Sequence, residues 1–287
     1  MPSTAFSLLL CPLCGARFSA ETEESSLSCG SGHRFDLAKQ GYVNFLTGKG
    51  TAFAADSAVM AAARANFLEA GHYQELAQRI ATKVPITVDH TPVVLDAGTG
   101  TGYYLHKVFQ NHAATAVALD ISKFALRRAA RLNPQAANVV WDIWQPLPLE
   151  AASVDMVMVV FAPRNASEFA RVLRTDGILV VVTPGPNHLR EIAQAADLLG
   201  IEHDKLKRLD TTMNQAFSLQ SREELCIPLE LSPAQTVDLA RMGPAGHHLD
   251  DSRAEELTRR LESSTTVHAE FVISTYLPLP DSEPASG

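Results

Sequence analysis

Short apolar runs, separated by polar and glycine-containing turns, recur through the middle of the chain. Strands buried on both faces of a parallel sheet read as nearly continuous hydrophobic runs, because neither face meets water. An amphipathic segment follows the first run after a glycine-containing turn and predicts a helix. The pattern therefore predicts an α/β fold on a mostly parallel sheet. The five runs are residues 93–95, 116–121, 138–143, 154–161 and 178–182.

Further elements are predicted on both sides of these runs. Residues 174–177 should form a tight turn into the fifth strand, and residues 224–231 a sixth strand. The alternation of apolar and polar positions over residues 266–276 predicts a last, antiparallel strand at the sheet edge. Helical periodicity and capping residues predict helices at residues 56–68, 75–84, 189–199, 232–242 and 253–262.

A glycine turn follows the first run, with Asp96 ahead of Gly98, Gly100 and Gly102. Only glycine lets a backbone approach a ligand so closely, and strand, glycine turn and helix start together are typical of a nucleotide-type site. A dinucleotide fold favours a third glycine one position later. The observed spacing instead resembles motif I of S-adenosylmethionine (SAM)-dependent methyltransferases. On this motif alone, NAD binding and a plain strand–turn–helix remain open.

Two more acids end the next predicted strands. Asp120 ends the second strand, where an acid can accept both ribose hydroxyls. Asp142 ends the third, a position that usually reaches the adenine amino group in methyltransferases and has no regular counterpart in NAD folds. Each acid alone also fits a helix cap. The ordered set favours a Rossmann-like SAM-dependent methyltransferase.

The first cysteines have metal-ligand spacing. Cys11 and Cys14 form C-x2-C, and Cys29 and His33 form C-x3-H after fourteen intervening residues. Three thiolates and an imidazole make a closed tetrahedral zinc site, which leaves no position for water and predicts a structural metal. A disulfide and a C-x-x-C redox pair are the alternatives. Cys226 lies in an apolar stretch and is expected to be a small core residue.

Composition limits the class of protein. The chain has 287 residues, 46% hydrophobic, and a net charge of −8 from 24 Lys+Arg against 32 Asp+Glu. This balance argues against a generally basic nucleic-acid binder but allows a local patch. Such a patch is expected on one face of the helix after Asp120, and an ordinary solvated face is the alternative. Its basic residues are Lys123, Arg127, Arg128 and Arg131.

The same sequence gives expectations about location and domains. No apolar run reaches about 18 residues, so we expect no membrane span. The first ten residues lack a basic n-region, so we expect no signal peptide and a cytoplasmic protein. The predicted division is residues 1–46 as a zinc-binding ribbon, 47–85 as a linker and cofactor-covering helices, 86–280 as the methyltransferase domain, and 281–287 as a disordered tail.

Taken together, these motifs resemble the RlmA-type 23S rRNA (guanine-N1)-methyltransferases, especially the tylosin-resistance members of that family. The resemblance covers nearly the whole chain. Zinc ribbons and motif I are common separately, but their combination with the other motifs is highly specific. Besides the cysteine module and the motif I turn, the matching segments are residues 35–44, 63–64, 71–73, 161–165 and 183–189.

The resemblance implies both activity and site residues. It implies methyl transfer from SAM to N1 of a guanine in a 23S rRNA hairpin loop, rRNA recognition by the ribbon at residues 1–46, resistance to tylosin-type macrolides, and a homodimer. Zinc ligands would be Cys11, Cys14, Cys29 and His33. The SAM contacts would be Tyr73, the turn Gly98–Leu105 with Gly102, Tyr104 and Leu105, and His188. Two departures concern residues 243–248, where relatives carry a tryptophan, and Thr99, where some have cysteine or glycine.

Methylation at guanine N1 requires the loss of the N1 proton, and the sequence does not identify the group that takes it. The turn after the fourth strand lies where base methyltransferases hold a flipped base. There, Phe161 is predicted to stack on guanine, the Ala162 carbonyl to accept from its amino group, and Arg164 to contact phosphate or O6. The alternative functions are a small-molecule methyltransferase of the ubiquinone-biosynthesis kind and a noncatalytic zinc-ribbon adaptor. Neither the modified nucleotide nor resistance follows from the residues themselves.

Overall fold

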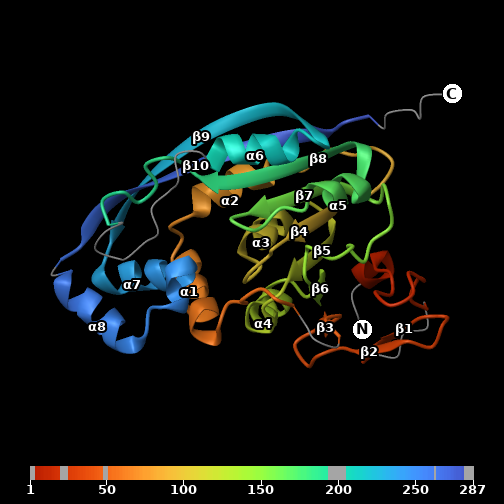
Figure 1. Cartoon of the computed structure of the whole chain (residues 1–287), viewed down its shortest axis with the longest axis horizontal. Coiled ribbons are helices and arrows are strands. Elements are labelled where there is room, and N and C mark those ends of the chain that lie inside the picture. Colours follow the sequence, from red (N-terminus) through yellow and green to blue (C-terminus); the bar gives the residue numbers. More distant parts are fainter. Residues whose placement is uncertain (1–3, 20–24, 48–50, 193–204, 262, 281–287) are drawn as a thin grey trace.

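A large twisted sheet forms the centre of the molecule (Figure 1). The computed structural model describes residues 4–19, 25–47, 51–192, 205–261 and 263–280. In that part of the chain the sheet has eight strands. In spatial order they are β3 (Tyr42–Asn44), β6 (Ala137–Val140), β5 (Thr115–Asp120), β4 (Val93–Ala97), β7 (Val154–Val160), β8 (Leu173–Pro184), β10 (Thr265–Pro278) and β9 (Phe217–Leu231).

The strand directions confirm the predicted fold class. All neighbours from β3 to β8 are parallel, and β10 is antiparallel to both β8 and β9. The five expected apolar runs become β4, β5, β6, β7 and β8. In β4 every residue is buried, because both faces of the sheet are covered.

Three expectations about the strands were wrong in detail. β10 is not the edge strand, because β9 begins at Phe217 and pairs with β10 along nearly its whole length. Residues 174–177 lie inside β8 as a bulge, since the register jumps from Val154↔Leu173 to Met156↔Ile178. Cys226 is exposed on β9 and is not a core residue.

Helices and the N-terminal segment cover the two faces of the sheet. The helices are α1 (Ala58–Glu69), α2 (Gln74–Ala81), α3 (Tyr103–Asn111), α4 (Lys123–Leu132), α5 (Ala166–Val172), α6 (Lys205–Met213), α7 (Pro233–Met242) and α8 (Asp251–Arg260), with short 3-10 turns at Thr4–Leu8 and Pro244–His247. Val94 and Met156 face α2 and α3, whereas Leu95 and Val157 face α5, α6 and the N-terminal segment. At one end of the molecule α1, α7 and α8 form a group (Figure 1).

Local capping explains where several helices begin. Ser57 caps α1 by accepting from the Met60 amide, and Ser232 forms a full capping box with Gln235 at α7. α8 begins after Asp250. The helix expected at residues 189–199 falls largely outside the described residues, as does the tail from residue 281. No described helix is both long enough and apolar enough to cross a bilayer.

The N-terminal segment packs against the same core as the large sheet. Its strands β1 (Ser26–Ser28) and β2 (Arg34–Asp36) form a small antiparallel hairpin. Leu9, Leu27 and Phe35 belong to the apolar cluster that also contains Leu95 of β4. β3 lies within the predicted zinc module yet pairs in parallel with β6 at the edge of the large sheet. The predicted domain limits stay a prediction.

Candidate cofactor and metal sites

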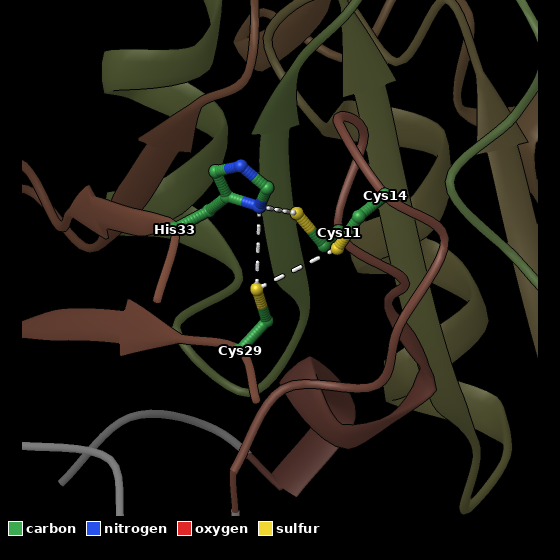
Figure 2. Close-up of side chains that lie close together, drawn as sticks. All are labelled: Cys11, Cys14, Cys29 and His33. Atoms are coloured by element: carbon green, nitrogen blue, oxygen red, sulfur yellow. Dashed lines mark hydrogen bonds between the residues drawn. The ribbon is translucent and has the colours of Figure 1, made fainter. Parts of the chain in front are cut away.

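The four predicted metal ligands converge at one point between two turns (Figure 2). Cys11 and Cys14 lie on the first turn, which Gly15 closes by donating its amide to the Cys11 carbonyl. Cys29 and His33 flank the turn of the β1–β2 hairpin. Their ligand atoms all lie within 4.8 Å of one another, so the structure brings together the complete predicted set.

The distances between these atoms fit a tetrahedral zinc ion. The Sγ atoms of Cys14 and Cys29 are 3.7 Å apart, and Nδ1 of His33 lies 3.6 Å from Cys11 Sγ and 3.5 Å from Cys29 Sγ. Zinc bonds of about 2.3 Å to sulfur and 2.0–2.1 Å to nitrogen place tetrahedral ligands roughly 3.6–3.8 Å apart. Hydrogen bonds from the Ala16 amide and the Ser31 side chain lower the pKa of Cys14 to about 6, which favours the thiolate that zinc requires.

A cavity of about 310 Å³ opens at the carboxyl ends of β4, β5, β6 and β7. This is the edge at which parallel α/β sheets bind ligands, and the volume is within the range of small-molecule sites. Its lining combines glycines, carboxylates and aromatic rings from six segments. The lining residues are Phe53, Ala54, Asp56, Arg64, Gly98, Gly100, Asp120, Ile121, Trp141, Asp142, Ile143, Trp144, Val160, Phe161, Ala162 and Pro163.

The glycine turn requires glycine for two separate reasons. Gly98 has a φ of +85°, and a Cβ on it would lie 2.3 Å from the Ala162 Cβ, so the turn after β7 packs directly on the turn after β4. Gly102 also has positive φ and precedes α3, where a Cβ would meet the Asn133 amide. Asp96 lies beneath the turn, where it accepts from the Thr99 hydroxyl, and burial raises its pKa to about 7. Asp96 does not line the cavity.

Asp120 presents a carboxylate to the cavity. Its oxygens accept from the amides of Gly100, at 2.8 Å, and Ser122, at 2.7 Å. Burial raises its pKa to about 6 despite these two bonds. Each carboxylate oxygen has a second lone pair, so the group can still accept from a diol.

Asp142 lies deeper, just beyond the end of β6, and is 6% exposed. One carboxylate oxygen accepts from the Thr51 hydroxyl at 2.7 Å, and the other from the Trp144 amide at 3.0 Å. The strand ends at Val140, two residues before the expected acid, so the carboxylate belongs to the following turn.

A smaller cavity of about 30 Å³ continues from the first past Gly98 and Gly100. Tyr73 and Tyr104 line it. The Tyr73 hydroxyl is buried and has no hydrogen-bond partner among the described residues. A buried polar atom without a partner is costly in a folded protein, and one that lines a cavity can gain its partner from a bound molecule. This orphan hydroxyl therefore fits a polar group of a bound molecule.

Arg64 lines both cavities and is the basic residue common to their walls. Its guanidinium donates to Asp56 at 2.8 Å and to the Met242 carbonyl at 2.7 Å, which joins α1 to the end of α7. The sequence predictions did not include Arg64 as a site residue. The motif at residues 63–64 was the available signal.

Several predicted site residues lie outside these two cavities. Leu105 is fully buried in the core. Nδ1 of His188 lies 2.6 Å from the Glu270 carbonyl oxygen, and its ring packs on Phe271. Arg164 is half-buried, and burial lowers its pKa. By contrast, Phe161 lines both cavities, and Ala162 lines the larger one.

The predicted basic helix face is only partly exposed. Lys123, Arg127 and Arg131, spaced four residues apart on α4, are exposed, whereas Arg128 is half-buried. The continuous basic stripe therefore has three members and not four.

Comparison with known proteins places both parts of the chain. A family model for the RlmA N-terminal zinc ribbon matches residues 9–48, and a methyltransferase-domain model matches residues 94–177. The 23S rRNA (guanine(748)-N(1))-methyltransferase of Streptomyces fradiae is 38% identical over 278 residues, covering 95% of this chain and 97% of its own. A Micromonospora griseorubida protein, provisionally named for 23S rRNA (guanine-N(1)-) methylation, is 38% identical over 94% of this chain and 97% of its own.

More distant similarities stop at the fold. The malonyl-[acyl-carrier protein] O-methyltransferase of Laribacter hongkongensis is 35% identical but covers only 45% of this chain and 50% of its own. The solved MccD protein aligns with a TM-score of 0.50 at 16% identity over 71% of this chain and 97% of its own, which supports the fold alone. Similarity to the two rRNA methyltransferases extends through both the zinc module and the cavity-bearing sheet. The chain thus belongs to the RlmA-type 23S rRNA (guanine-N1)-methyltransferase family, SAM-dependent enzymes with a zinc ribbon.

Proposed function

We propose that this chain transfers the methyl group of SAM to N1 of a guanine in a hairpin loop of 23S rRNA. The observation that carries the proposal is 38% identity to the Streptomyces fradiae enzyme over nearly the full length of both chains. A small-molecule methyltransferase is less well supported, because the relative that acts on malonyl-[acyl-carrier protein] covers less than half of this chain. A noncatalytic adaptor is also less well supported, because Asp120 and Asp142, the acids expected to bind SAM, both line the cavity.

We infer that SAM lies across the two cavities. Asp120 would accept the two ribose hydroxyls, and Asp142 the adenine amino group. The methionine end would then reach Tyr73 and Arg64, where a guanidinium can meet the carboxylate of SAM and the orphan hydroxyl can gain a partner. Gly98 and Gly100, which line both cavities, would leave room for the ligand beside the backbone, whereas Gly102 lines neither and stays a prediction. His188, Tyr104 and Leu105 stay predictions from the family resemblance.

Bound SAM supplies an electrophilic methyl group for in-line displacement, so the chain mainly orients two reactants and excludes water. Phe161 is proposed to stack on the guanine, because its ring is partly exposed at the junction of the two cavities. The Ala162 carbonyl is proposed to accept from the guanine amino group. A role for Arg164 at phosphate or O6 is proposed from the sequence pattern alone.

The arrangement of domains and copies is also proposed. Residues 1–46 would recognise rRNA, residues 47–85 cover SAM, and residues 86–280 carry the reaction. A homodimer, action in the cytoplasm and resistance to tylosin-type macrolides follow from the family resemblance. Sedimentation of the purified protein tests the dimer, and drug sensitivity of a susceptible host that expresses the chain tests resistance.

The test is methyl transfer to unmodified 23S rRNA. Methylation at N1 blocks the Watson–Crick edge of guanine, so reverse transcription should stop one nucleotide before a single guanine after incubation with SAM. The relative from Streptomyces fradiae, named for guanine 748, makes that position the first to inspect. Asp120→Asn should weaken the stop when SAM is held near the wild-type dissociation constant. If the protein binds SAM but reverse transcription then passes every guanine of the treated rRNA without a stop, the proposal is refuted.

A further inference from the structure

Three aromatic rings in the structure have unusually exposed side chains, and all three line the same cavity. Phe53 is 52% exposed, Trp144 48% and Phe161 37%, and these are the large exposed aromatics among the residues the structure describes. Exposed apolar side chains that are scattered singly are normal in proteins, whereas several that gather at one site mark a binding surface. Phe161 has a proposed role, whereas Phe53 and Trp144 have none.

Phe53 and Trp144 form a pair. Their ring centroids are 6.3 Å apart with an interplanar angle of 32°, although the residues lie on segments far apart in the sequence. Phe53 precedes α1 in the segment that connects the zinc module to the methyltransferase sheet. Trp144 follows β6 in the turn that carries Asp142.

A single carboxylate holds the two ring-bearing segments together. Asp142 accepts from the Trp144 amide and from the Thr51 hydroxyl, and that same hydroxyl oxygen accepts from the Phe53 amide at 3.2 Å. The Asn165 side chain also donates to the Ile143 carbonyl at 2.8 Å, which ties this turn to the segment that carries Phe161. The backbone segments that carry the two rings are therefore held together by hydrogen bonds, and the rings contact each other.

The inner wall beside these rings is closed. Trp141 and Ile143 are each 5% exposed and enclose the part of the cavity next to Asp142. Phe53 and Trp144 stand at the outer edge of this wall. A planar group that stacks on them would lie beside the cavity mouth and outside the buried part.

We propose that Phe53 and Trp144 form a stacking platform for an unpaired nucleobase of the substrate RNA, next to the guanine that enters the cavity. This inference rests on the proposed function. Aromatic side chains bind single-stranded RNA by stacking on successive bases, each stack changing affinity by roughly tenfold or more. Such binding suits a chain with a net charge of −8, because stacking does not depend on neutralising phosphates.

The test uses leucine variants, which keep apolar volume but remove the aromatic face. In Phe53→Leu and Trp144→Leu, the dissociation constant and KM for the hairpin fragment bearing the mapped guanine should rise about tenfold each. The slope of log affinity against log salt should stay unchanged, because no phosphate contact is lost. Trp144→Phe should recover most of the affinity. Leu219→Ala, an exposed apolar residue on β9, is the matched control.

Two further measurements separate the platform from other roles. The chain has two tryptophans, and Trp141 is buried, so quenching of tryptophan fluorescence by the RNA fragment should largely disappear in Trp144→Leu. In both leucine variants, the SAM dissociation constant measured by calorimetry should stay within about twofold of the wild-type value.

Either of two results would overturn the platform while the proposed function stands. One is an unchanged RNA affinity in both leucine variants of an enzyme that methylates rRNA. The other is a loss of SAM affinity equal to the loss of RNA affinity, which would assign the rings to the cofactor. Failure of the wild-type protein to methylate rRNA would instead refute the proposed function.

Discussion

At the scale of single residues, the larger cavity offers the Asp120 carboxylate as a hydrogen-bond acceptor, and the smaller one offers the unpaired hydroxyl of Tyr73. Asp120 was predictable because a short strand followed by an acid is a local pattern. Arg64, Phe53 and Trp144 were missed because their places depend on how distant segments meet. Arg64 lines the cavities while it donates to Asp56 and to the Met242 carbonyl, which lies 178 residues away in the sequence. No periodicity in the sequence reports such a contact.

The raised pKa of Asp120 makes SAM binding depend on pH. The ionised carboxylate is the better acceptor for ribose hydroxyls, and burial raises its pKa to about 6. The SAM dissociation constant should therefore rise as pH falls through about 6, by up to about tenfold per pH unit below that value. Calorimetry between pH 5 and 8 measures this. Asp120→Asn should bind SAM at least about tenfold more weakly at pH 8 and lose the pH dependence. A wild-type affinity that is flat across this range would contradict the assignment.

The stability of the free protein should respond to Asp120 in the opposite direction. A carboxyl whose pKa is higher in the folded than in the unfolded state binds its proton more tightly when folded. Its contribution to folding is therefore full below the ordinary aspartate value and is lost as pH rises through about 6. From pH 4 to pH 8, the unfolding free energy of wild type should therefore fall relative to that of Asp120→Asn, with most of the change near pH 6.

The orphan hydroxyl of Tyr73 gives a second residue-scale prediction. A buried hydroxyl without a partner costs roughly 1–3 kcal/mol, so Tyr73→Phe should stabilise the SAM-free protein by about 1 kcal/mol. The same change should weaken SAM binding several-fold, because the ligand loses its partner. Denaturant unfolding and calorimetry on the one variant measure the two effects. Lower stability together with unchanged SAM affinity would show that the hydroxyl is not a ligand group.

At the scale of elements, the buried strands were predictable and their neighbours were not. Continuous apolar runs identify a strand that is covered on both faces, as for β4 and β7. Alternation over β10 reports which side chains face the core but not whether another strand pairs on its far side. The bulge in β8 was mistaken for a turn, because turn residues also occur where a strand breaks register.

The contact between the turns after β4 and β7 can be tested through Gly98. A Cβ there would lie 2.3 Å from that of Ala162, and φ is +85°. Gly98→Ala should abolish measurable SAM binding and lower stability. Gly41→Ala is the matched control, since Gly41 has φ of +93° with open space around it. It should cost only about 1 kcal/mol of backbone strain and leave SAM affinity intact. Equal losses of SAM affinity in the two variants would mean that the positive φ, and not the close approach to Ala162, explains the need for glycine at position 98.

At the scale of the whole molecule, the zinc module is continuous with the methyltransferase core. The ring centroids of Phe35 and Phe45 are 4.9 Å apart, and the Phe45 ring packs on Trp141 in the wall of the larger cavity. The cysteine spacing predicted the metal cluster, because its ligands are local in the sequence. It did not predict the shared core, which depends on contacts between distant segments.

This continuity predicts that loss of zinc weakens the entire fold. Apparent zinc affinity in small modules is on the order of 10 kcal/mol and is coupled to folding. Cys14→Ser should lose its zinc and lower the melting temperature by about 10 °C or more in one cooperative transition. Cys226→Ser, an exposed cysteine outside the cluster, should keep both zinc and melting temperature. Two transitions in Cys14→Ser, the upper one unchanged, would show that the module unfolds alone.

The chemical identity of the methylated nucleoside tests the central claim most directly. Wild-type protein, SAM and unmodified 23S rRNA should yield, after complete digestion, 1-methylguanosine approaching one per rRNA molecule by mass spectrometry. With SAM held near the wild-type dissociation constant, Asp120→Asn should yield much less in the same time. Methyl groups found only on another nucleoside, or only on a small molecule offered in competition, would contradict the account.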